Sequence, residues 1–260
     1  HPPLCMRSAM KITAAPLTLD LRTTFRIAHG ASDQRFNVLC QLEEGLGEAA
    51  VVPYYGDTQE SILTYLRQAD ELPGDDPALL EGLLANLPPG SPASRAAIDI
   101  ALHDLWGKRL GQPLYRLLGL DPSHLPPTSF TIGIDQPEVM AERARTCGYP
   151  IIKVKLGSPD DAAALAAIRR ATSARLRVDA NAGWNYKQAL ELIPILAQFD
   201  LELVEQPLPR GDIEGVRALR GQLRQRGIHT PIFVDESVRS ARDVAAHAGL
   251  AGDLGALLQR

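Results

Sequence analysis

The chain has 260 residues, of which 45% are hydrophobic and 22% charged, an ordinary composition for a globular protein of one large or two smaller domains. Its net charge of −4 argues against nucleic acid and anionic membranes as partners, and no apolar run approaches the roughly 20 residues that span a bilayer. The N-terminus lacks the layout of a signal peptide, and Cys5, Cys40 and Cys147 have neither metal nor redox spacing, so we expect a cytoplasmic protein with reduced cysteines.

The first half of the chain predicts a small α+β domain over residues 10–125, preceded by an unstructured leader at 1–9. Residues 11–52 alternate between apolar and polar side chains in the manner of antiparallel strands. Gly45–Gly47 is a signal for a tight turn within this stretch. The pattern therefore favours a small sheet at the start of the domain.

Helices are expected to follow this sheet. One begins near Asp57, which would cap it together with Glu60 three residues later. A short helix is predicted over 77–85. A longer one is predicted over 93–118, with Pro113 interrupting it.

The second half predicts a parallel β/α architecture, because five short apolar runs alternate with helix-length segments. The runs are 128–134, 151–156, 175–179, 201–206 and 231–236. Asn185 is expected to cap the helix after the third run, and Pro194 should kink or shorten it. A closed α/β barrel needs eight strands. We therefore expect residues 126–260 to form an incomplete (β/α) TIM-type barrel of about five strands.

Four of these runs end in a charged residue, namely Lys155, Asp179, Glu205 and Asp235, which are 24, 26 and 30 residues apart. A charge at the end of a strand buried on both faces is unfavourable unless it is paired. The carboxyl ends of parallel strands are also where such folds bind ligands. The four strand ends therefore predict one shared site.

Asp179, Glu205 and Asp235 supply three carboxylates from successive strands. Hard oxygen ligands in this number suit Mg²⁺. Without a cation, three neighbouring carboxylates would repel one another at a cost on the order of several kcal/mol. Each carboxylate taken singly could instead cap a helix or pair with an arginine, but their occurrence at three consecutive strand ends favours a metal.

Lys153 and Lys155 lie on one face of a single strand. Two surface lysines on a solvated strand are the alternative, but Ile152 and Val154 make the strand apolar. Neighbouring ammonium groups disfavour each other's protonation, which favours a lysine as a base. A lysine facing a carboxylate-bound Mg²⁺ could remove a proton α to a carboxylate. A Schiff-base aldolase is less favoured, because it leaves the carboxylates without a role.

The motifs IIKVKLG, RVDANAGWN, ELVEQPLP and FVDES resemble, in this order, those of the muconate-lactonizing branch of the enolase superfamily. Within it the match is to the dipeptide epimerases, the group of L-Ala-D/L-Glu epimerase. FRIAHG, GEAAVVPYYGDTQES and SRAAIDIALHDLWGKRLGQPLYRLLG are similar to that family's capping domain. The resemblance covers about residues 11–245 and implies an Mg²⁺-dependent isomerase that moves the α-proton of a dipeptide.

The resemblance also implies a role for individual residues. The Mg²⁺ ligands, one ion per site, would be Asp179, Glu205 and Asp235. Lys155 would be the base on one face of the substrate α-carbon, and Lys153 its tuning partner and a contact for the substrate carboxylate.

Other positions carry lesser implied roles. Asn181 and Glu236 would lie beside the ligands and support them. Loops near 22–30 and 52–57 would close over the site and set specificity, with three candidate substrate contacts: Arg26, Tyr54 and Tyr55.

The chain departs from the family at its C-terminus. The family has a second lysine on a sixth strand and an acidic motif on an eighth, but no lysine follows Asp235, and residues from Gly252 onward do not resemble the sixth strand. We therefore expect a C-terminally truncated epimerase impaired in inversion, or a non-catalytic metal-binding fragment. An open sheet edge would also favour assembly with another chain, such as a homo-oligomer.

Three other reactions of the branch use the same strand ends and stay open. They are muconate cycloisomerisation, o-succinylbenzoate synthesis and N-acylamino-acid racemisation.

Overall fold

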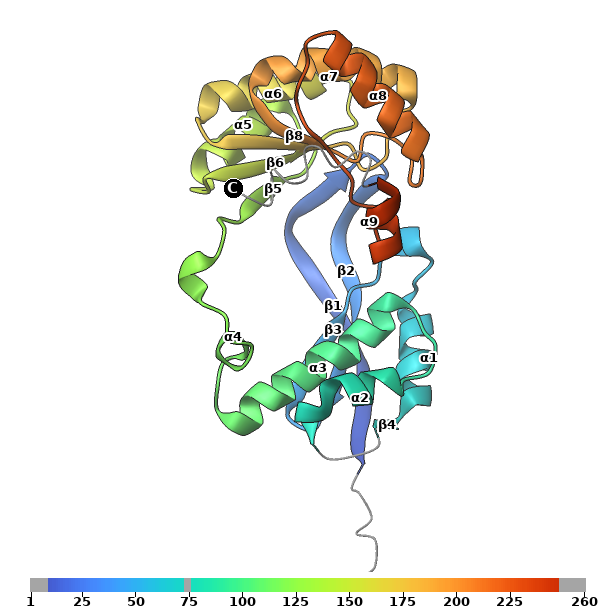
Figure 1. Ribbon diagram of the computed structural model, residues 1–260. Coiled ribbons are helices and arrows are strands. Elements are labelled where there is room, and N and C mark those ends of the chain that lie inside the picture. The colour runs from blue at the N-terminus through green and yellow to red at the C-terminus, as the bar shows by residue number, and fades with distance from the viewer. Residues whose placement is uncertain (1–8, 73–75, 248–260) are drawn as a thin grey trace, which may run out of the picture. The chain divides into compact units, whose positions relative to one another are not determined.

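The computed structural model describes residues 9–72 and 76–247 (Figure 1). The chain divides into two compact units, one of residues 1–22 and 33–125 and the other of residues 23–32 and 126–260. Apart from Ala9, the leader predicted at 1–9 lies outside the described residues. None of the helices in the described ranges combines the length and apolar character needed to cross a membrane.

The first unit contains a four-stranded sheet in the order β3-β2-β1-β4. Its strands are β1 (Met10–Ile27), β2 (Gly30–Leu42), β3 (Gly45–Ala49) and β4 (Glu71–Leu72). Strands β2 and β3 pair antiparallel, as predicted, and β1 pairs antiparallel with β4. The tight turn is formed by Glu43 and Glu44 instead of Gly45–Gly47.

The glycines of β3 have a packing role instead. A Cβ at Gly47 would lie 2.0 Å from the carbonyl oxygen of Ala97, in helix α3 (Pro92–Leu110). Glycine therefore lets β3 approach the helix backbone directly. The core between them buries Val38, Ile98 and Leu102 completely.

Two helix predictions need correction. Helix α1 (Gln59–Ala69) is capped by Thr58 and Ser61 and not by Asp57 and Glu60, because Thr58 has the extended backbone that a cap requires. The interruption predicted at Pro113 within 93–118 is confirmed, but α3 already ends at Leu110, because Gly111 adopts a left-handed φ of 60°. The remaining elements of this unit are η1 (Pro53–Tyr55), η2 (Pro77–Leu79), α2 (Leu80–Ala85), α4 (Leu114–Leu117) and η3 (Pro122–His124).

The second unit contains a parallel sheet in the order β5-β6-β7-β8-β9. Its strands are β5 (Ser129–Ile132), β6 (Ile151–Lys155), β7 (Arg175–Asp179), β8 (Leu201–Glu205) and β9 (Ile232–Phe233). Over the described part of the chain this confirms the predicted barrel-like architecture of five strands.

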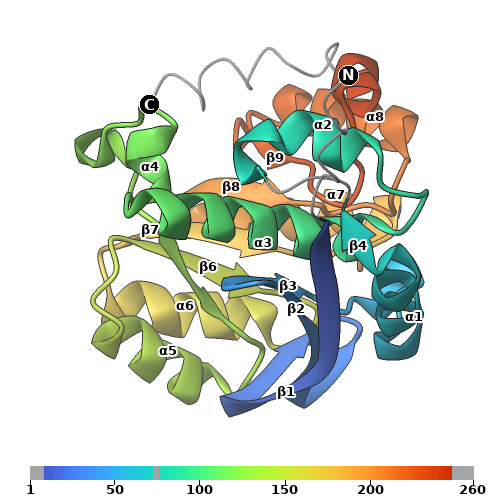
Figure 2. The same ribbon diagram turned by 90° about the horizontal axis from the view of Figure 1, so that it is seen from below.

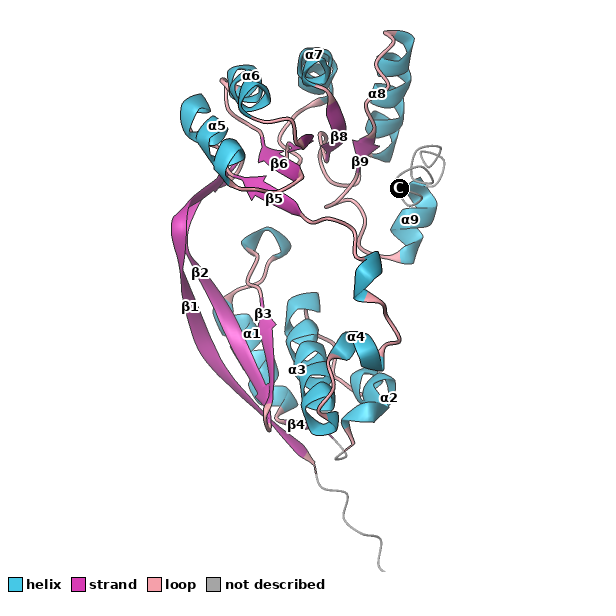
Figure 3. Cartoon of the chain, turned by 90° about the vertical axis from the view of Figure 1, so that its left-hand side faces the viewer, coloured by secondary structure: helices cyan, strands magenta, loops and turns pink. Residues whose placement is uncertain are grey.

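Helices connect these strands and cover one face of the sheet (Figure 3). They are α5 (Pro137–Thr146), α6 (Asp161–Ala171), α7 (Tyr186–Leu196), η4 (Ala197–Phe199) and α8 (Ile213–Gln225), and α9 (Ala241–His247) follows the last strand. Helices α5 and α6 lie side by side (Figure 2). As predicted, Asn185 caps α7, and the helix ends at Leu196, two residues after Pro194.

The alternation of side chains along the strands positions the site. Ile152 and Val154 of β6 are buried in the core that packs on the helices, together with Val178 of β7. Successive side chains point to opposite faces of a strand. Lys153 and Lys155 therefore project from the face opposite the helices.

Candidate active site

The ends of β6, β7 and β8 lie side by side in register. Lys155 is paired with Asp179 across β6 and β7, and Asp179 is paired with Glu205 across β7 and β8. The three charged residues share one edge of the sheet because each is the last residue of its strand. The pairing of the backbones brings these three predicted site residues together.

Two ammonium groups join the carboxylates at this edge. Lys153 Nζ lies 2.9 Å from Asp179 Oδ2 and 2.7 Å from Glu205 Oε1. Lys155 Nζ lies 2.7 Å from the same Asp179 Oδ2 and donates to Asn181 Oδ1 at 3.0 Å. Asp179 is fully buried, and Lys155 and Glu205 are nearly so. Buried charges in this number require one another as partners.

Burial and neighbouring charges shift the pKa values of this cluster in opposite directions. Burial alone would raise the pKa of Asp179, but the ammonium groups of Lys155 and Lys153 hold it below its usual value. The pKa of Glu205 is raised, first by burial and then by the carboxylates of Asp179 and Asp235. Burial is the largest cause of the raised pKa of Glu205, and the neighbouring carboxylates add to it although Lys153 acts in the opposite direction.

The sequence argument that paired lysines lower each other's pKa does not hold for Lys153. Burial lowers its pKa, but hydrogen bonds and charge from Asp179 and Glu205 outweigh burial, so the pKa is raised. The carboxylates therefore dominate the electrostatics of this lysine.

Asp235 is placed differently from the other predicted ligands. It lies two residues beyond the end of β9, and its side chain is exposed. Its charge raises the pKa of Glu205, so it lies near the cluster. Among the described residues, however, no group of three or more histidine, cysteine or acidic side chains is gathered as a metal site. The Lys153 ammonium bridges Asp179 and Glu205, and Asp235 lies outside the strand ladder, so the role of these three carboxylates as metal ligands stays a prediction.

The donor chemistry nevertheless fits a hard cation. The Lys153 ammonium already occupies a position between two carboxylates, where positive charge is required. Oε2 of Glu236 is buried without a hydrogen-bond partner. A divalent cation would offset the neighbouring carboxylate charge, which adds to burial in raising the pKa of Glu205. The oxygens of Asp179, Glu205 and Asp235 could hold Mg²⁺ after Lys153 moves aside.

Asn181 and Glu236, predicted to lie beside the ligands, are both buried at this edge. Asn181 Nδ2 donates to Asp179 Oδ2 at 3.3 Å and to Glu236 Oε1 at 3.2 Å. Its Oδ1 accepts from Lys155. Asn181 thus connects the lysine, a carboxylate of β7 and the loop after β9.

Gln206 was missed by the sequence analysis, although it directly follows Glu205 in the ELVEQPLP motif. It is fully buried, and its Oε1 accepts from the backbone N–H groups of Asp235 at 2.9 Å and Ser237 at 3.2 Å. Its Nε2 donates to Leu208 O and Ser237 Oγ. Gln206 therefore fixes the loop that carries Asp235.

The three predicted substrate contacts belong to two different units. Arg26 is exposed near the end of β1, and its carbonyl accepts from Ile134 N at 2.9 Å. Tyr54 and Tyr55 belong to the first unit, are exposed, and form an edge-to-face pair with ring centroids 5.1 Å apart. Their role in substrate binding stays a prediction.

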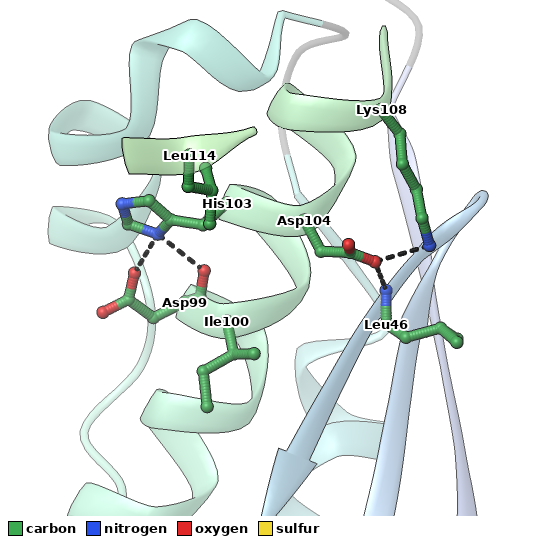
Figure 4. Close-up of a pocket in the computed structure, with 7 residues that line it drawn as sticks. All are labelled: Leu46, Asp99, Ile100, His103, Asp104, Lys108 and Leu114. Atoms are coloured by element: carbon green, nitrogen blue, oxygen red, sulfur yellow. Dashed lines mark hydrogen bonds and ion pairs between the residues drawn. The ribbon is translucent and has the colours of Figure 1, made fainter. Parts of the chain in front are cut away.

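A pocket of about 640 Å³ lies on α3 in the first unit (Figure 4). Its charged groups pair among themselves, with Lys108 Nζ 2.6 Å from Asp104 Oδ2 and His103 Nδ1 2.8 Å from Asp99 Oδ1. The lining comprises Leu46, Asp99, Ile100, His103, Asp104, Lys108 and Leu114. None of these is a predicted site residue.

Comparison with known protein families follows the two halves of the chain. Residues 10–119 match the N-terminal domain of the mandelate racemase / muconate lactonizing enzyme family, and residues 138–251 match the enolase C-terminal domain-like family. The chain belongs to the mandelate racemase / muconate lactonizing enzyme family of the enolase superfamily.

Individual relatives narrow the similarity to the dipeptide epimerases, which confirms the resemblance seen in the motifs. The chain is 38% identical over 250 residues to the L-Ala-D/L-Glu epimerase of Bacteroides thetaiotaomicron, covering 92% of this chain and 64% of that protein. It is 36% identical over 256 residues to the L-Ala-D/L-amino acid epimerase of Pedosphaera parvula, covering 90% and 71%. The chain thus spans about two thirds of the length of the curated relatives it matches.

A solved structure gives the same result. The dipeptide epimerase of Enterococcus faecalis, complexed with Mg and the dipeptide L-Leu-L-Tyr, matches with a TM-score of 0.77 and 33% identity, covering 92% of this chain and 70% of that one.

Proposed function

We propose that the chain carries the proton-abstracting part of an Mg²⁺-dependent dipeptide epimerase, an isomerase. The observation that carries the proposal is the buried contact of Lys155 with Asp179 and Asn181 at the carboxyl ends of β6 and β7. The names of the similar epimerases support the substrate class.

In this proposal Lys155, in its neutral form, takes the α-proton of the bound dipeptide on Nζ. The ammonium group so formed is stabilised by Asp179 Oδ2 and Asn181 Oδ1, which already lie within hydrogen-bond distance. Since Lys155 is 9% exposed, the transfer would take place largely away from water.

Lys153 would leave its carboxylate partners and pair with the substrate carboxylate, for which its partial exposure is suited. Asp179, Glu205 and Asp235 would hold one Mg²⁺. When bound, Mg²⁺ supplies positive charge that offsets the negative charge developing on the substrate as the α-proton leaves.

Return of the proton to the same face of the α-carbon gives exchange, whereas return to the opposite face gives inversion. Exchange and inversion must therefore be measured separately.

The test is NMR spectroscopy of a dipeptide panel that includes L-Ala-L-Glu, incubated with the full chain and Mg²⁺ in D₂O. Loss of the α-proton signal is expected, and the configuration of the α-carbon is followed separately. Loss of the α-proton signal with inversion would mean that another group returns a proton to the opposite face of the α-carbon. No exchange with any dipeptide, together with no effect of Mg²⁺ on melting, would overturn the proposal and favour a non-catalytic fragment.

Other reactions of the family form the second candidate. The chain is 30% identical to the N-succinyl-L-Arg/Lys racemase of Bacillus cereus, and its fold matches a muconate lactonizing enzyme from Pseudomonas fluorescens at 25% identity and a TM-score of 0.80. Adding N-succinyl amino acids and muconolactone to the NMR panel separates these reactions from dipeptide epimerisation.

The remaining expectations concern partners and location. Composition and resemblance predict a small-molecule substrate, with no nucleic acid or membrane as partner. They also predict a homo-oligomer in the cytoplasm. These expectations all stay predictions. Sedimentation analysis of the purified chain tests the oligomeric state.

A further inference from the structure

The tip of the β1–β2 hairpin, residues 25–30, belongs to the second unit along with the charged strand ends. Its backbone contacts the loop after β5, where Ile134 N donates to Arg26 O at 2.9 Å. A Cβ added at Gly133 would lie 3.1 Å from the same carbonyl oxygen. The hairpin tip therefore packs closely against the first of the strand-end loops.

Two further loops contact the tip at Ala28. A Cβ added at Gly157, after β6, would lie 2.7 Å from Ala28 Cβ. A Cβ added at Gly183, after β7, would lie 3.2 Å from the same atom. Glycines in two separate loops thus leave room for one methyl group, which fixes the tip against the ends of β6 and β7.

Next to Ala28, His29 makes a hydrogen bond to the loop after β7. His29 Nε2 lies 2.6 Å from the carbonyl oxygen of Asn181, a residue 152 positions further along the chain. Since a carbonyl oxygen only accepts, Nε2 carries the hydrogen and donates it.

The acceptor belongs to a strained segment. Asn181 and Ala182 have φ values of 46° and 59°, so two consecutive non-glycine residues adopt the left-handed conformation. Such backbone persists only where surrounding contacts hold it. Here the holding contacts include Asn181 N to Asp179 Oδ1 at 2.8 Å, Ala182 N to Gln206 O at 2.7 Å, and the bond from His29.

The side chain of Asn181 is what makes this strain relevant to the site, because its Oδ1 accepts from Lys155 Nζ. We propose that His29 is a positioning residue: by binding the Asn181 carbonyl, it keeps the strained loop in place and Asn181 Oδ1 on Lys155. The catalytic consequence rests on the proposed function, whereas the effect on the loop does not.

The decisive measurement is amide hydrogen–deuterium exchange of the full chain without Mg²⁺ or substrate. In His29→Leu, amides of residues 179–184 are expected to exchange about tenfold faster, the effect of losing one hydrogen bond. His29→Gln retains a donor and should restore most of the protection. His229→Leu makes the same chemical change at another exposed histidine, outside the hairpin tip, and should leave these amides unaffected.

Packing at Ala28 supplies an independent variant. Ala28→Val adds two methyl groups against Gly157 and Gly183 and is expected to speed exchange in the same segment, while Ala28→Gly should not. The proposal is overturned if residues 179–184 exchange at the same rate in His29→Leu as in the parent chain. It is also overturned if exchange rises equally throughout the second unit, since that is general destabilisation.

Turnover provides the functional readout. If the chain exchanges dipeptide α-protons, His29→Leu should lower kcat about tenfold with KM changed by less than about twofold, and His29→Gln should recover kcat. A larger change in KM than in kcat would overturn the positioning role in favour of a substrate contact. A parent chain without any turnover would contradict the proposed function, and the exchange data would still decide the role of His29 in the loop.

Discussion

The ends of β6, β7 and β8 differ from the end of β9 in how they place their charged residues. Lys155, Asp179 and Glu205 are paired directly through the sheet, so the backbone ladder alone brings them together. Asp235 comes after a strand of two residues, and its backbone is held by the buried amide of Gln206. Backbone hydrogen bonds between strands position a residue whatever its side chain is. A residue in a loop depends on a contact from another side chain, here that of Gln206.

The largest expected effect concerns Lys155, one of the residues at the paired strand ends. Lys155→Met removes the group that takes the α-proton, so dipeptide proton exchange in D₂O should fall about 10³-fold, the usual contribution of a general base. Lys187→Met changes an exposed lysine and should leave the rate unchanged. If Lys155→Met exchanges the dipeptide α-proton at the parent rate, another group is the base that removes this proton.

Stability should also separate the two placements. Asp179→Asn leaves the ammonium groups of Lys153 and Lys155 with less buried negative charge and should lower the free energy of unfolding by about 3 kcal/mol. Asp235→Asn, at an exposed position, should change it by less than about 0.5 kcal/mol.

The measurement is urea denaturation in a Trp106→Phe background, where Trp184 of the second unit is the remaining tryptophan of the two in the chain. If Asp179→Asn and Asp235→Asn lower the free energy of unfolding equally, residues placed by strand pairing and by a loop do not differ in their contribution to stability.

Gln206→Leu tests whether the β9 loop depends on that one amide. The change leaves the backbone N–H groups of Asp235 and Ser237 without their acceptor, so we expect a loss of about 2 kcal/mol. The Mg²⁺ concentration that gives half of the maximal increase in melting temperature should rise, because the backbone of Asp235 is no longer held in place. Gln225→Leu, at the exposed end of α8, is the control. An unchanged Mg²⁺ midpoint would show that Asp235 is placed by something else.

The smallest expected effect is a difference in pH dependence in the metal-free protein. The pKa of Asp179 is lowered by folding, so its stabilising contribution is present above the unfolded-state pKa and is lost as pH falls through the folded-state pKa. The pKa of Glu205 is raised by folding, so its contribution has the opposite sign and stability decreases as pH rises through that range.

Glu205→Gln should therefore stabilise the metal-free protein at neutral pH, with a gain that disappears in acid, while Asp179→Asn destabilises it. Urea titrations at several pH values measure both. A loss of stability in Glu205→Gln at neutral pH would mean that its bond to Lys153 outweighs the crowding of charge.

The sequence predicted those features that repeat along the chain. Alternating apolar runs predicted β6, β7 and β8 almost to the residue, and Asn185 predicted the start of α7. The contact of Lys155 with Asp179 could be anticipated because parallel strands place their last residues at one edge. The predicted strand 231–236 shortens to β9, since Asp235 follows the last ladder pair.

Contacts made by loops could not be predicted in the same way. Nothing in the spacing of FRIAHG indicates that His29 binds a carbonyl 152 residues away, because this contact depends on two glycines in other loops. The cap of α1 at Thr58 was missed for a related reason, since Asp57 and Thr58 are both good caps and only the backbone conformation selects one. The bridging of two carboxylates by Lys153 likewise depends on side-chain length and not on strand pairing.

The position of the hairpin tip also has a consequence for the order of folding. Ala28 is synthesised early, but Gly157 and Gly183, against which it packs, follow by more than a hundred residues. At a synthesis rate of about 5–20 residues per second, the tip waits on the order of ten seconds for its partners to leave the ribosome. Closing so long a loop is slow compared with pairing neighbouring strands. The hairpin tip should therefore join the second unit late, after β6, β7 and β8 have already formed their ladder.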